Sequence, residues 1–393
     1  MSLYIRCGVL LDGTGSAPLR DAVVEVRDGR IEAVHRQSPA PMQGTIIDWS
    51  PFTVLPGLID AHDHLTLDLG DEELQSREPE VWTALKGAAT AERILSSGIT
   101  TLRDCGARQH IDVQLRAAIA DGLVRGPRVL VSGVPLTISG GPCWFLGGEV
   151  DGPAEIRRLI RQQVKAGVDW IKVFMTGGAA SKGTNMLRAI FSGEDLRIIV
   201  EEAHEAERRV VVHCHGGAGV RHAVLAGADT IEHGVYFTRA DLELLAERGV
   251  PLVVTYGVYE RGVHSPDVPP FFRERCVDVM AQYLKTIALA REVGVQIAVG
   301  TDTVHRDLVA ELRALVRAGY RASDALQACT GWAAKVLRLP DTGTVANGKM
   351  ADLVAVEGDP LADVEAVGQV RGVMKAGVVA PAADASAAQL GSR

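Results

Sequence analysis

The strongest constraint on the fold is a change of rhythm that begins at Thr53. From there on, short apolar runs rich in β-branched residues alternate with longer stretches of helical periodicity. This alternation is typical of repeated βα units and a parallel sheet. Eight such runs are present: TVLPGLIDAH, ITTLRDC, RVLVSG, DWIKVF, RVVVHCH, DTIEHG, PLVVTY and VQIAVGTD. They predict an α/β fold of the (β/α)8, or TIM, barrel type.

The two ends of the chain have the pattern of short strands instead. SLYIRCGVLL precedes DAVVEVRDGRIEAVH, in which Asp28-Gly29 separates two apolar runs as a hairpin turn does. NGKMADLVAVEGDP and RGVMKAGVVA repeat this pattern near the other end. We expect a small β-sandwich domain made of residues 1–55 and residues 343–393, with the barrel over residues 56–342. The small, polar segment from Pro381 onward is expected to be a loose tail.

Composition argues against several classes of protein. The 41 basic and 49 acidic residues give a net charge of −8, and no dense basic run suggests a nucleic-acid partner. Six scattered cysteines without CxxC pairs fit a reducing compartment, so we expect a cytoplasmic protein. The first apolar stretch is brief and is broken by Arg6 and Asp12. We expect neither a signal peptide nor a membrane span, and no membrane partner.

Side chains that suit metal binding stand at the ends of the predicted strands. His62 and His64 end the first strand and point to the same side, because they are two residues apart. The fourth, fifth, sixth and eighth strands contribute Lys172, His213, His233 and Asp302. In a barrel of this type the active site forms at the C-terminal ends of the strands. The sequence therefore predicts a metal site with these six ligands.

This donor set predicts hydrolytic chemistry. Imidazole nitrogen and carboxylate oxygen suit zinc and similar divalent ions, and catalytic sites keep one position open for water. Water on such an ion loses a proton near pH ~7 and becomes a nucleophile. Asp302 is the predicted catalytic residue, because its carboxylate can bind the metal, accept that proton and pass it to the leaving group.

Lys172 needs a separate explanation, because an ammonium among apolar neighbours and metal ions is costly. The neutral amine is a nucleophile, and we expect it to capture carbon dioxide as a carbamate. Carboxylated Lys172 would then bridge two metal ions as a carboxylate does. The alternative is a buried amine paired with a carboxylate such as Asp302.

Further residues are candidate substrate contacts. His215 follows His213 by two residues on the same face, so either is a possible direct ligand; we favour His213 and assign His215 to substrate or to the ligand surroundings. Arg221, early in the helix after the fifth strand, is placed to meet an anionic group, with simple solvent exposure as the alternative. Tyr256 ends the seventh strand and is placed to hydrogen-bond a substrate carbonyl. His305 lies at the predicted rim, just beyond the eighth strand.

The motifs DAHDH, IKVFMTGG, VVVHCHGG, IEHG and GTD resemble the amidohydrolase superfamily, and VLPGLIDAHDH and GKMADLVAVEGDP extend the resemblance nearly from end to end. IKVFMTGG and HCHG are most similar to the branch of imidazolonepropionase-like hydrolases and metal-dependent Xaa-Pro dipeptidases. Members of that branch often have two divalent metals, expected here to be zinc, bridged by a carboxylated lysine. The resemblance implies one metal on His62, His64 and Asp302, a second on His213 and His233, and Lys172 as the bridge.

Two positions bear on the substrate. In SGGPCWF, Pro142 stands where many relatives have a histidine, so this chain lacks that contact or takes another substrate. Arg221 falls where relatives that cleave dipeptides or acylated amino acids offer a group to the α-carboxylate. We expect a small-molecule substrate such as a dipeptide or N-acyl amino acid, cleaved at an amide or peptide-like C–N bond.

Two other functions remain open from the sequence. The same metal cage suits hydrolysis of a cyclic amide or a deamination, and pocket shape would separate these reactions. A non-catalytic barrel that binds a ligand is the third reading. A homo-oligomer is a general expectation for a soluble enzyme of this size.

Overall fold

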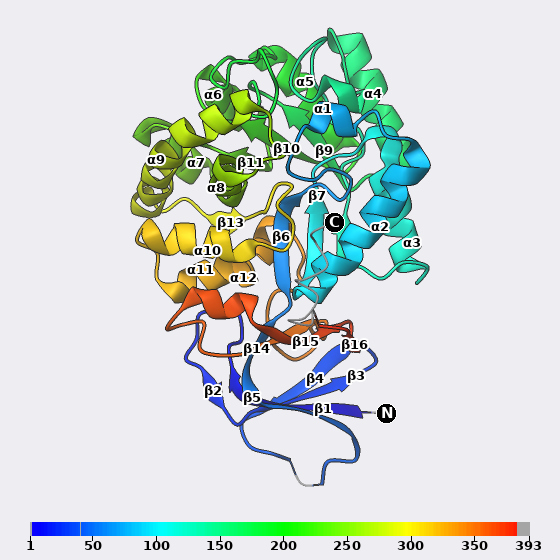
Figure 1. Cartoon of the computed structure of the whole chain (residues 1–393), viewed down its shortest axis with the longest axis vertical. Helices are drawn as coiled ribbons and strands as arrows, with labels where there is room; N and C mark the ends of the chain where they lie inside the picture. The colour runs from blue at the N-terminus through cyan, green and yellow to red at the C-terminus, as the bar shows by residue number, and fades with distance from the viewer. Residues whose placement is uncertain (1, 40, 383–393) are drawn as a thin grey trace.

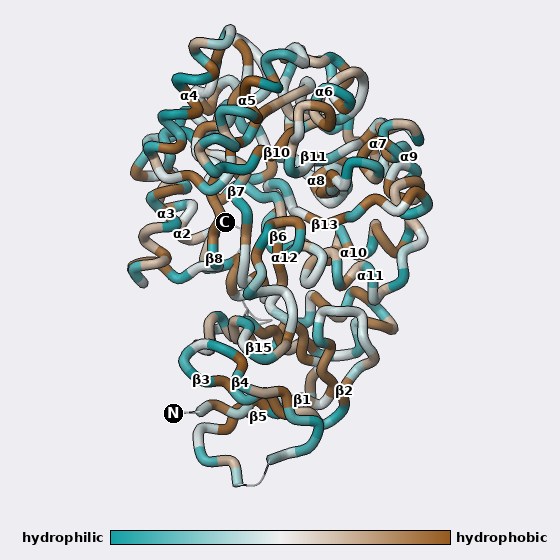
Figure 2. The backbone as a smooth tube through the Cα atoms, turned by 180° about the vertical axis from the view of Figure 1, so that it is seen from behind, coloured by the Kyte–Doolittle hydropathy of each residue, from teal (hydrophilic) through white to brown (hydrophobic). Residues whose placement is uncertain are grey.

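The computed structural model describes residues 2–39 and 41–382, so residues 383–393 of the predicted tail lie outside the described part of the chain. The protein has a mixed α/β fold. A β-rich end joins a larger part in which strands lie among helices (Figure 1). Hydrophobic segments run along strands in both parts, such as β1 and β10 (Figure 2).

Strands from both ends of the chain form one eight-stranded sheet in the order β16-β15-β14-β5-β1-β3-β4, with β2 paired to β1. The N-terminal strands are β1 (Ser2–Leu10), β2 (Leu19–Arg20), β3 (Val23–Arg27), β4 (Arg30–His35) and β5 (Gly44–Pro56). The C-terminal strands are β14 (Leu353–Val356), β15 (Val370–Lys375) and β16 (Val378–Ala380). Because β14 pairs antiparallel with β5, the last strands are hydrogen-bonded to the first.

This sheet encloses a hydrophobic core of its own. Its buried side chains come from strands far apart in the order, among them Ile31 of β4 and Met374 of β15. The Ala351 N–H donates to the Gly29 carbonyl at 2.9 Å, and the Ile31 N–H donates to the Lys349 carbonyl at 2.8 Å. The turn between β3 and β4 therefore lies against the segment that leads into β14. The division into domains at residues 55 and 342 stays a prediction.

All eight runs predicted from the alternation contain strands, and these form two parallel sheets. The three-stranded sheet, in the order β6-β7-β8, consists of β6 (Leu58–Asp63), β7 (Ile99–Asp104) and β8 (Arg128–Leu130). The five-stranded sheet runs in the order β13-β12-β11-β10-β9. Its strands are β9 (Trp170–Phe174), β10 (Arg209–Cys214), β11 (Thr230–His233), β12 (Leu252–Val254) and β13 (Ile297–Val299).

Backbone hydrogen bonds link the outer strands β6 and β9 to the segments that follow β13 and β8, the outer strands of the other sheet. Next to β6 and β13, the Asp302 N–H donates to the His62 carbonyl at 2.9 Å. Next to β8 and β9, the Leu136 N–H donates to the Lys172 carbonyl at 2.8 Å, and the Phe174 N–H donates to the Leu136 carbonyl at 2.9 Å. Strands from both sheets therefore end beside one another.

Helices cover the parallel strands (Figure 1). They are α1 (Glu72–Gln75), α2 (Glu80–Ser96), α3 (Ile111–Ala120), α4 (Pro153–Ala166), α5 (Gly193–Glu205), α6 (Ala218–Ala226), α7 (Arg239–Arg248), α8 (Gly257–His264), α9 (Pro270–Val293), α10 (Leu308–Arg317), α11 (Ala322–Ala328) and α12 (Gly331–Val336). Short 3₁₀ turns lie at Arg108–His110, Trp144–Leu146 and Val364–Gly368. Ser192 and Thr238 begin α5 and α7 with capping boxes, which fix where those helices start. Among the described helices, none has the length and apolarity needed to cross a membrane.

The contact between β6 and β13 gives the first prediction, Gly300→Ala. A Cβ at Gly300 would lie 2.4 Å from His62 Cβ and 2.6 Å from the His62 backbone nitrogen, so one of the two strands must shift. Overpacking of this kind costs about 1–3 kcal/mol, and backbone atoms yield less than side chains, so we expect a loss at the upper end of that range. Thermal and urea unfolding measure it.

Gly193→Ala is the matched control, because its new Cβ would meet His222 at an ordinary 3.4 Å. Equal stability of the two variants would contradict the tight packing inferred between β6 and β13.

Candidate metal centre

Histidines and an aspartate converge where the parallel strands end. The Asp302 carboxylate lies among them, with Oδ1 3.5 Å from His62 Nε2 and 3.7 Å from His64 Nε2. Its other oxygen lies 3.8 Å from His233 Nδ1. One donor atom from each of His62, His64 and Asp302 lies within 4.8 Å of the others. This spacing suits three ligands of one ion.

Hydrogen bonds at the Nδ1 atoms fix how three of the rings are turned. His62 Nδ1 lies 2.7 Å from the Glu232 carboxylate, and His64 Nδ1 donates to the Gly106 carbonyl at 2.8 Å. His233 Nδ1 lies 2.7 Å from the Thr255 hydroxyl. Each ring therefore keeps its Nε2 atom for another partner. His233 Nε2 is buried and has no partner among the described residues.

His213 and His215, at the end of β10, both lie in this cluster. Their ring centroids are 4.6 Å apart, and His213 is 4.5 Å and His215 5.0 Å from the ring of His233. His213 Nε2 is 3.4 Å from the Gly177 carbonyl. His215 is fully buried, and neither of its ring nitrogens has a partner among the described residues. The choice of His213 over His215 as direct ligand stays a prediction.

Lys172 comes from β9 and is 1% exposed. Its Nζ atom lies 5.4 Å from the centroid of the Phe174 ring. Within residues 2–39 and 41–382, no carboxylate oxygen comes within 4.0 Å of this amine, so the predicted alternative of a direct pair with Asp302 is not seen. An uncompensated buried amine is costly, which favours a chemical role for it.

The donor set fits a divalent metal. Burial lowers the pKa of His64 to about 4 and holds the pKa of His233 well below its usual value, so both rings are neutral, as metal ligands must be. At His62 burial acts the same way, but Cys105 and Asp302 outweigh it and raise the pKa. A metal ion at these nitrogens would take the place of that proton. Imidazole nitrogens with a carboxylate are typical zinc ligands.

Residues 53–380 match the amidohydrolase family. The chain belongs to the amidohydrolase family. Families of this type generally use a metal centre, which agrees with the clustered donors of His62, His64 and Asp302. The family membership predicted from the motifs is confirmed.

Several relatives of this amidohydrolase have the names of hydrolases. Ochratoxinase of Aspergillus niger is 31% identical, over 92% of this chain and 82% of the relative. Imidazolonepropionase of Nocardia farcinica is 26% identical, over 87% of this chain and 88% of the relative. The crystal structure of a Xaa-Pro dipeptidase with methionine bound in its active site superposes with a TM-score of 0.90 at 29% identity, covering 96% of this chain and 99% of that one. This chain is therefore a hydrolytic enzyme.

The candidate ligands line a cavity of the amidohydrolase. His62, His64, Lys172, His213, His215, His233 and Asp302 all contribute to it. The cavity also contains residues that the sequence did not single out, namely Glu72, Cys143, Tyr259 and Phe272. Their only signal in the sequence was position, because they lie in or just after the loops that follow strands, where binding residues gather.

Tyr256 and Arg221 are not among the residues that line this cavity. Strand β12 ends at Val254, and Tyr256 already has helical backbone angles of φ −75° and ψ −36°, so strand alternation no longer sets its direction. Its buried hydroxyl has no partner among the described residues, and its ring faces the Arg317 guanidinium at 5.9 Å. Arg221 is exposed on α6, which is the alternative the sequence left open.

His305 is also outside the cavity lining, because both of its ring nitrogens face carboxylates. Nδ1 lies 2.8 Å from Asp63 and Nε2 lies 3.2 Å from Asp68. Burial opposes protonation, yet these two carboxylates raise the pKa of His305 to about 10. His305 is therefore a cation that ties the segment after β13 to β6 and the loop beyond it.

A buried ion pair lies behind the candidate metal ligands. The Glu232 carboxylate binds His62 Nδ1 with one oxygen and the Arg103 guanidinium, at 2.9 Å, with the other. Arg103 is fully buried and also donates to the Ala61 carbonyl at 2.8 Å. Burial alone would raise the pKa of Glu232, but Arg103 and His62 hold it at about 2. This ionised carboxylate orients His62 for metal binding.

The ion pair gives the second prediction, Glu232→Gln. The amide keeps the shape of the side chain but loses the charge that orients His62 and balances Arg103. Losing such a partner typically lowers metal affinity about 10–100-fold. Competition with a chelator, followed by elemental analysis, measures the change.

Glu357→Gln is the matched control, because it removes a carboxylate that pairs with Arg371 at the surface, away from the ligands. Unchanged metal affinity in Glu232→Gln, with the fold verified by circular dichroism, would show that Glu232 does not support His62.

Proposed function

We propose that this amidohydrolase is a metal-dependent hydrolase of an amide or peptide-like C–N bond in a small molecule. The observation that carries the proposal is the Asp302 carboxylate, which faces the Nε2 atoms of His62 and His64 at 3.5 and 3.7 Å inside one cavity. A nearby buried His233 Nε2 without a partner supports a second set of ligands. In this proposal the two parallel sheets form one (β/α)8 barrel, and the eight-stranded sheet folds over as a sandwich.

The proposed ligand sets divide between two ions. His62, His64 and Asp302 would hold one ion, and His213 and His233 the other. Carboxylated Lys172 would lie between them, which accounts for a buried amine without a carboxylate partner. When bound, such ions supply Lewis-acid activation of a carbonyl and of water.

Asp302 is the proposed proton carrier. Burial alone would raise the pKa of its carboxyl group, but His62 and His64 hold that pKa well below the usual range. The carboxylate is therefore ionised and able to accept a proton from water. It lines the cavity, so the same oxygen atoms can hand the proton to the leaving nitrogen.

His215 is the proposed substrate-positioning imidazole. Burial lowers its pKa to about 3, so the ring is neutral and has one N–H donor and one acceptor nitrogen. Both nitrogens are without partners among the described residues, and the ring lines the cavity. Such a ring can donate to a substrate carbonyl.

The relatives support an amide or peptide-like bond as the target. Ochratoxinase and Xaa-Pro dipeptidase are names of the relatives, and they do not identify the substrate of this chain. A cyclic amide is the second candidate, because imidazolonepropionase is also a relative. A panel of dipeptides, N-acyl amino acids and cyclic amides separates the two.

The metal requirement gives the third prediction. Purified protein should contain close to two equivalents of zinc or a similar ion, and the His62→Ala/His64→Ala variant should lose metal and amide hydrolysis together. His204→Ala is the control, because this histidine pairs with Asp229 on the outside of α5. Full activity after the metal has been removed by a chelator would refute the proposal.

The fourth prediction compares two tyrosines. Tyr259 lines the cavity and Tyr256 does not, so Tyr259→Phe should raise KM or lower kcat by about 10-fold if its hydroxyl binds substrate, as a typical hydrogen bond contributes about 1.4 kcal/mol. Tyr256→Phe should leave both constants unchanged. Steady-state kinetics on the best amide of the panel measures the difference, and the opposite pattern would restore the role that the sequence suggested for Tyr256.

A further inference from the structure

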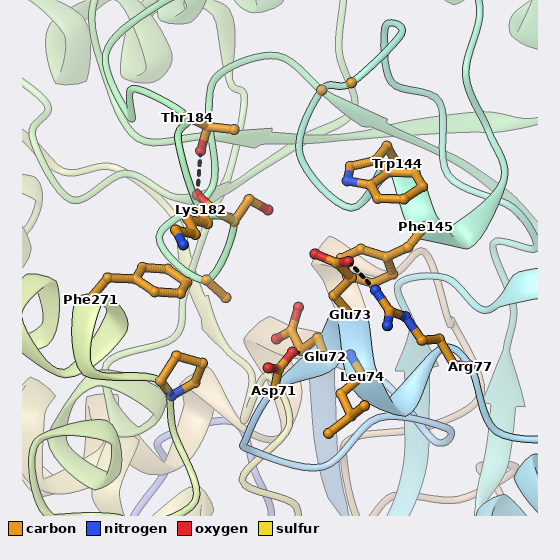
Figure 3. Close-up of a pocket in the computed structure, with 15 residues that line it drawn as sticks. Asp71, Glu72, Glu73, Leu74, Arg77, Trp144, Phe145, Lys182, Thr184 and Phe271 are labelled. Carbon is orange, nitrogen blue, oxygen red and sulfur yellow. Dashed lines mark hydrogen bonds and ion pairs between the residues drawn. The ribbon is translucent and has the colours of Figure 1, made fainter.

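A second, outer chamber lies next to the cavity at the candidate metal centre. The outer chamber has a volume of about 310 Å³ and is walled partly by Trp144, Phe145 and Phe271. Glu72, Ala180 and Ser181 line both spaces. Glu72 therefore lies at the boundary between the outer chamber and the candidate metal centre. Figure 3 shows the Glu72 and Asp71 carboxylates on the side of the outer chamber opposite Lys182 and Phe271.

The carboxylate of Glu72 differs from those of its neighbours in its contacts. Its neighbour Glu73 is paired with Arg77 at 2.8 Å, and the Asp71 side chain caps α1 by accepting from the Leu74 N–H at 3.0 Å. The carboxylate of Glu72 has no hydrogen bond or ion pair with any residue in the described part of the chain. A cation placed beside this unpaired carboxylate would compensate its charge.

Apart from the proposed metal ions, the side chains of the inner cavity offer few cationic groups to a substrate carboxylate. Among the described residues that line it, the carboxylates are Glu72 and Asp302, and Lys172 is the one lysine or arginine. Arg221, the anchor expected from the sequence, is exposed on α6 and is not part of the lining.

The apolar lining of the inner cavity would strengthen a charge pair formed inside it. Phe174, Val258 and Phe272 present apolar surface to the same cavity. A charge pair is stronger where such walls exclude water, and aromatic faces also attract cations.

We propose that Glu72 determines specificity by binding a protonated amine of the substrate. The substrate class is then an amide with a positively charged amino group close to the scissile bond, such as an aminoacyl amide with a free α-amine. This inference rests on the proposed hydrolysis of amides at the metal centre. Glu72 acts by charge recognition and not as a metal ligand.

The test uses two substrates that differ only in charge, the dipeptide Phe-Ala and N-acetyl-Phe-Ala, with the metal-loaded enzyme. Wild-type enzyme should favour the free amine. Glu72→Gln should lower kcat/KM for Phe-Ala about 100-fold, the usual scale for removing one partner of a desolvated charge pair, and change the acetylated compound less than about 3-fold. Glu73→Gln, next to it but already paired with Arg77, should leave both values unchanged.

Two further measurements, the metal content of each variant and its activity on a wider panel of amides, determine how each outcome is interpreted. Glu72→Gln should retain the metal content of wild type, and loss of metal would identify Glu72 as a ligand and overturn the inference. Equal losses on both substrates, or a wild-type enzyme that cleaves other amides but neither of these, would also overturn it. A metal-loaded wild-type enzyme that hydrolyses no amide in the panel would instead refute the proposed function itself.

Discussion

The hydrogen bond from the Asp302 backbone to the His62 carbonyl, at 2.9 Å, is the contact on which the candidate site depends. It joins β6 and β13, which are far apart in the chain, and brings three candidate ligands to one place. The Asp60 carboxylate reinforces the same seam by accepting from the Thr301 hydroxyl at 2.6 Å. Backbone geometry and packing thus position the donors before any metal contributes energy.

Buried charges around this seam divide the histidines into two kinds. His305 is held as a cation between Asp63 and Asp68, where it has a structural part. His64 and His233, by contrast, use one nitrogen for a neutral hydrogen bond and keep the other free. The same residue type therefore serves as a structural ion on one side of β6 and as a candidate ligand on the other. The difference comes from which polar groups each ring meets.

Hydrogen bonds from one arginine to backbone carbonyls fix part of the cavity wall. The Arg275 guanidinium, from α9, donates to the carbonyls of Gly178, Ala179, Ser181 and Thr184 at 2.8–3.0 Å. It thereby holds the loop after β9, which lines both chambers. Loops carry substrate choice on a scaffold shared by many relatives, so the loop after β9 is placed to influence which substrate enters.

The sequence alone determined the strands and the candidate ligands. Alternating βα periodicity located all eight parallel strands, because an apolar run of that length has few other structures open to it. The ends of those strands gave His62, His64, Lys172, His213, His233 and Asp302, which the structure brings to one cavity. This succeeded because parallel strands present their carboxyl ends at one edge.

Only the tertiary structure decided which other side chains reach that cavity. Tyr256 was assigned because it ends a predicted strand, but the backbone has already turned toward α8 there. His305 is bound by two carboxylates that lie more than 230 residues earlier in the chain. Glu232 and Arg103 look like ordinary strand residues until β7 and β11 bring them to His62. Glu72 begins α1, a helix of four residues that is too short to show a periodic pattern. Contacts of this kind depend on the packing of distant segments, and local pattern contains no information about such distances.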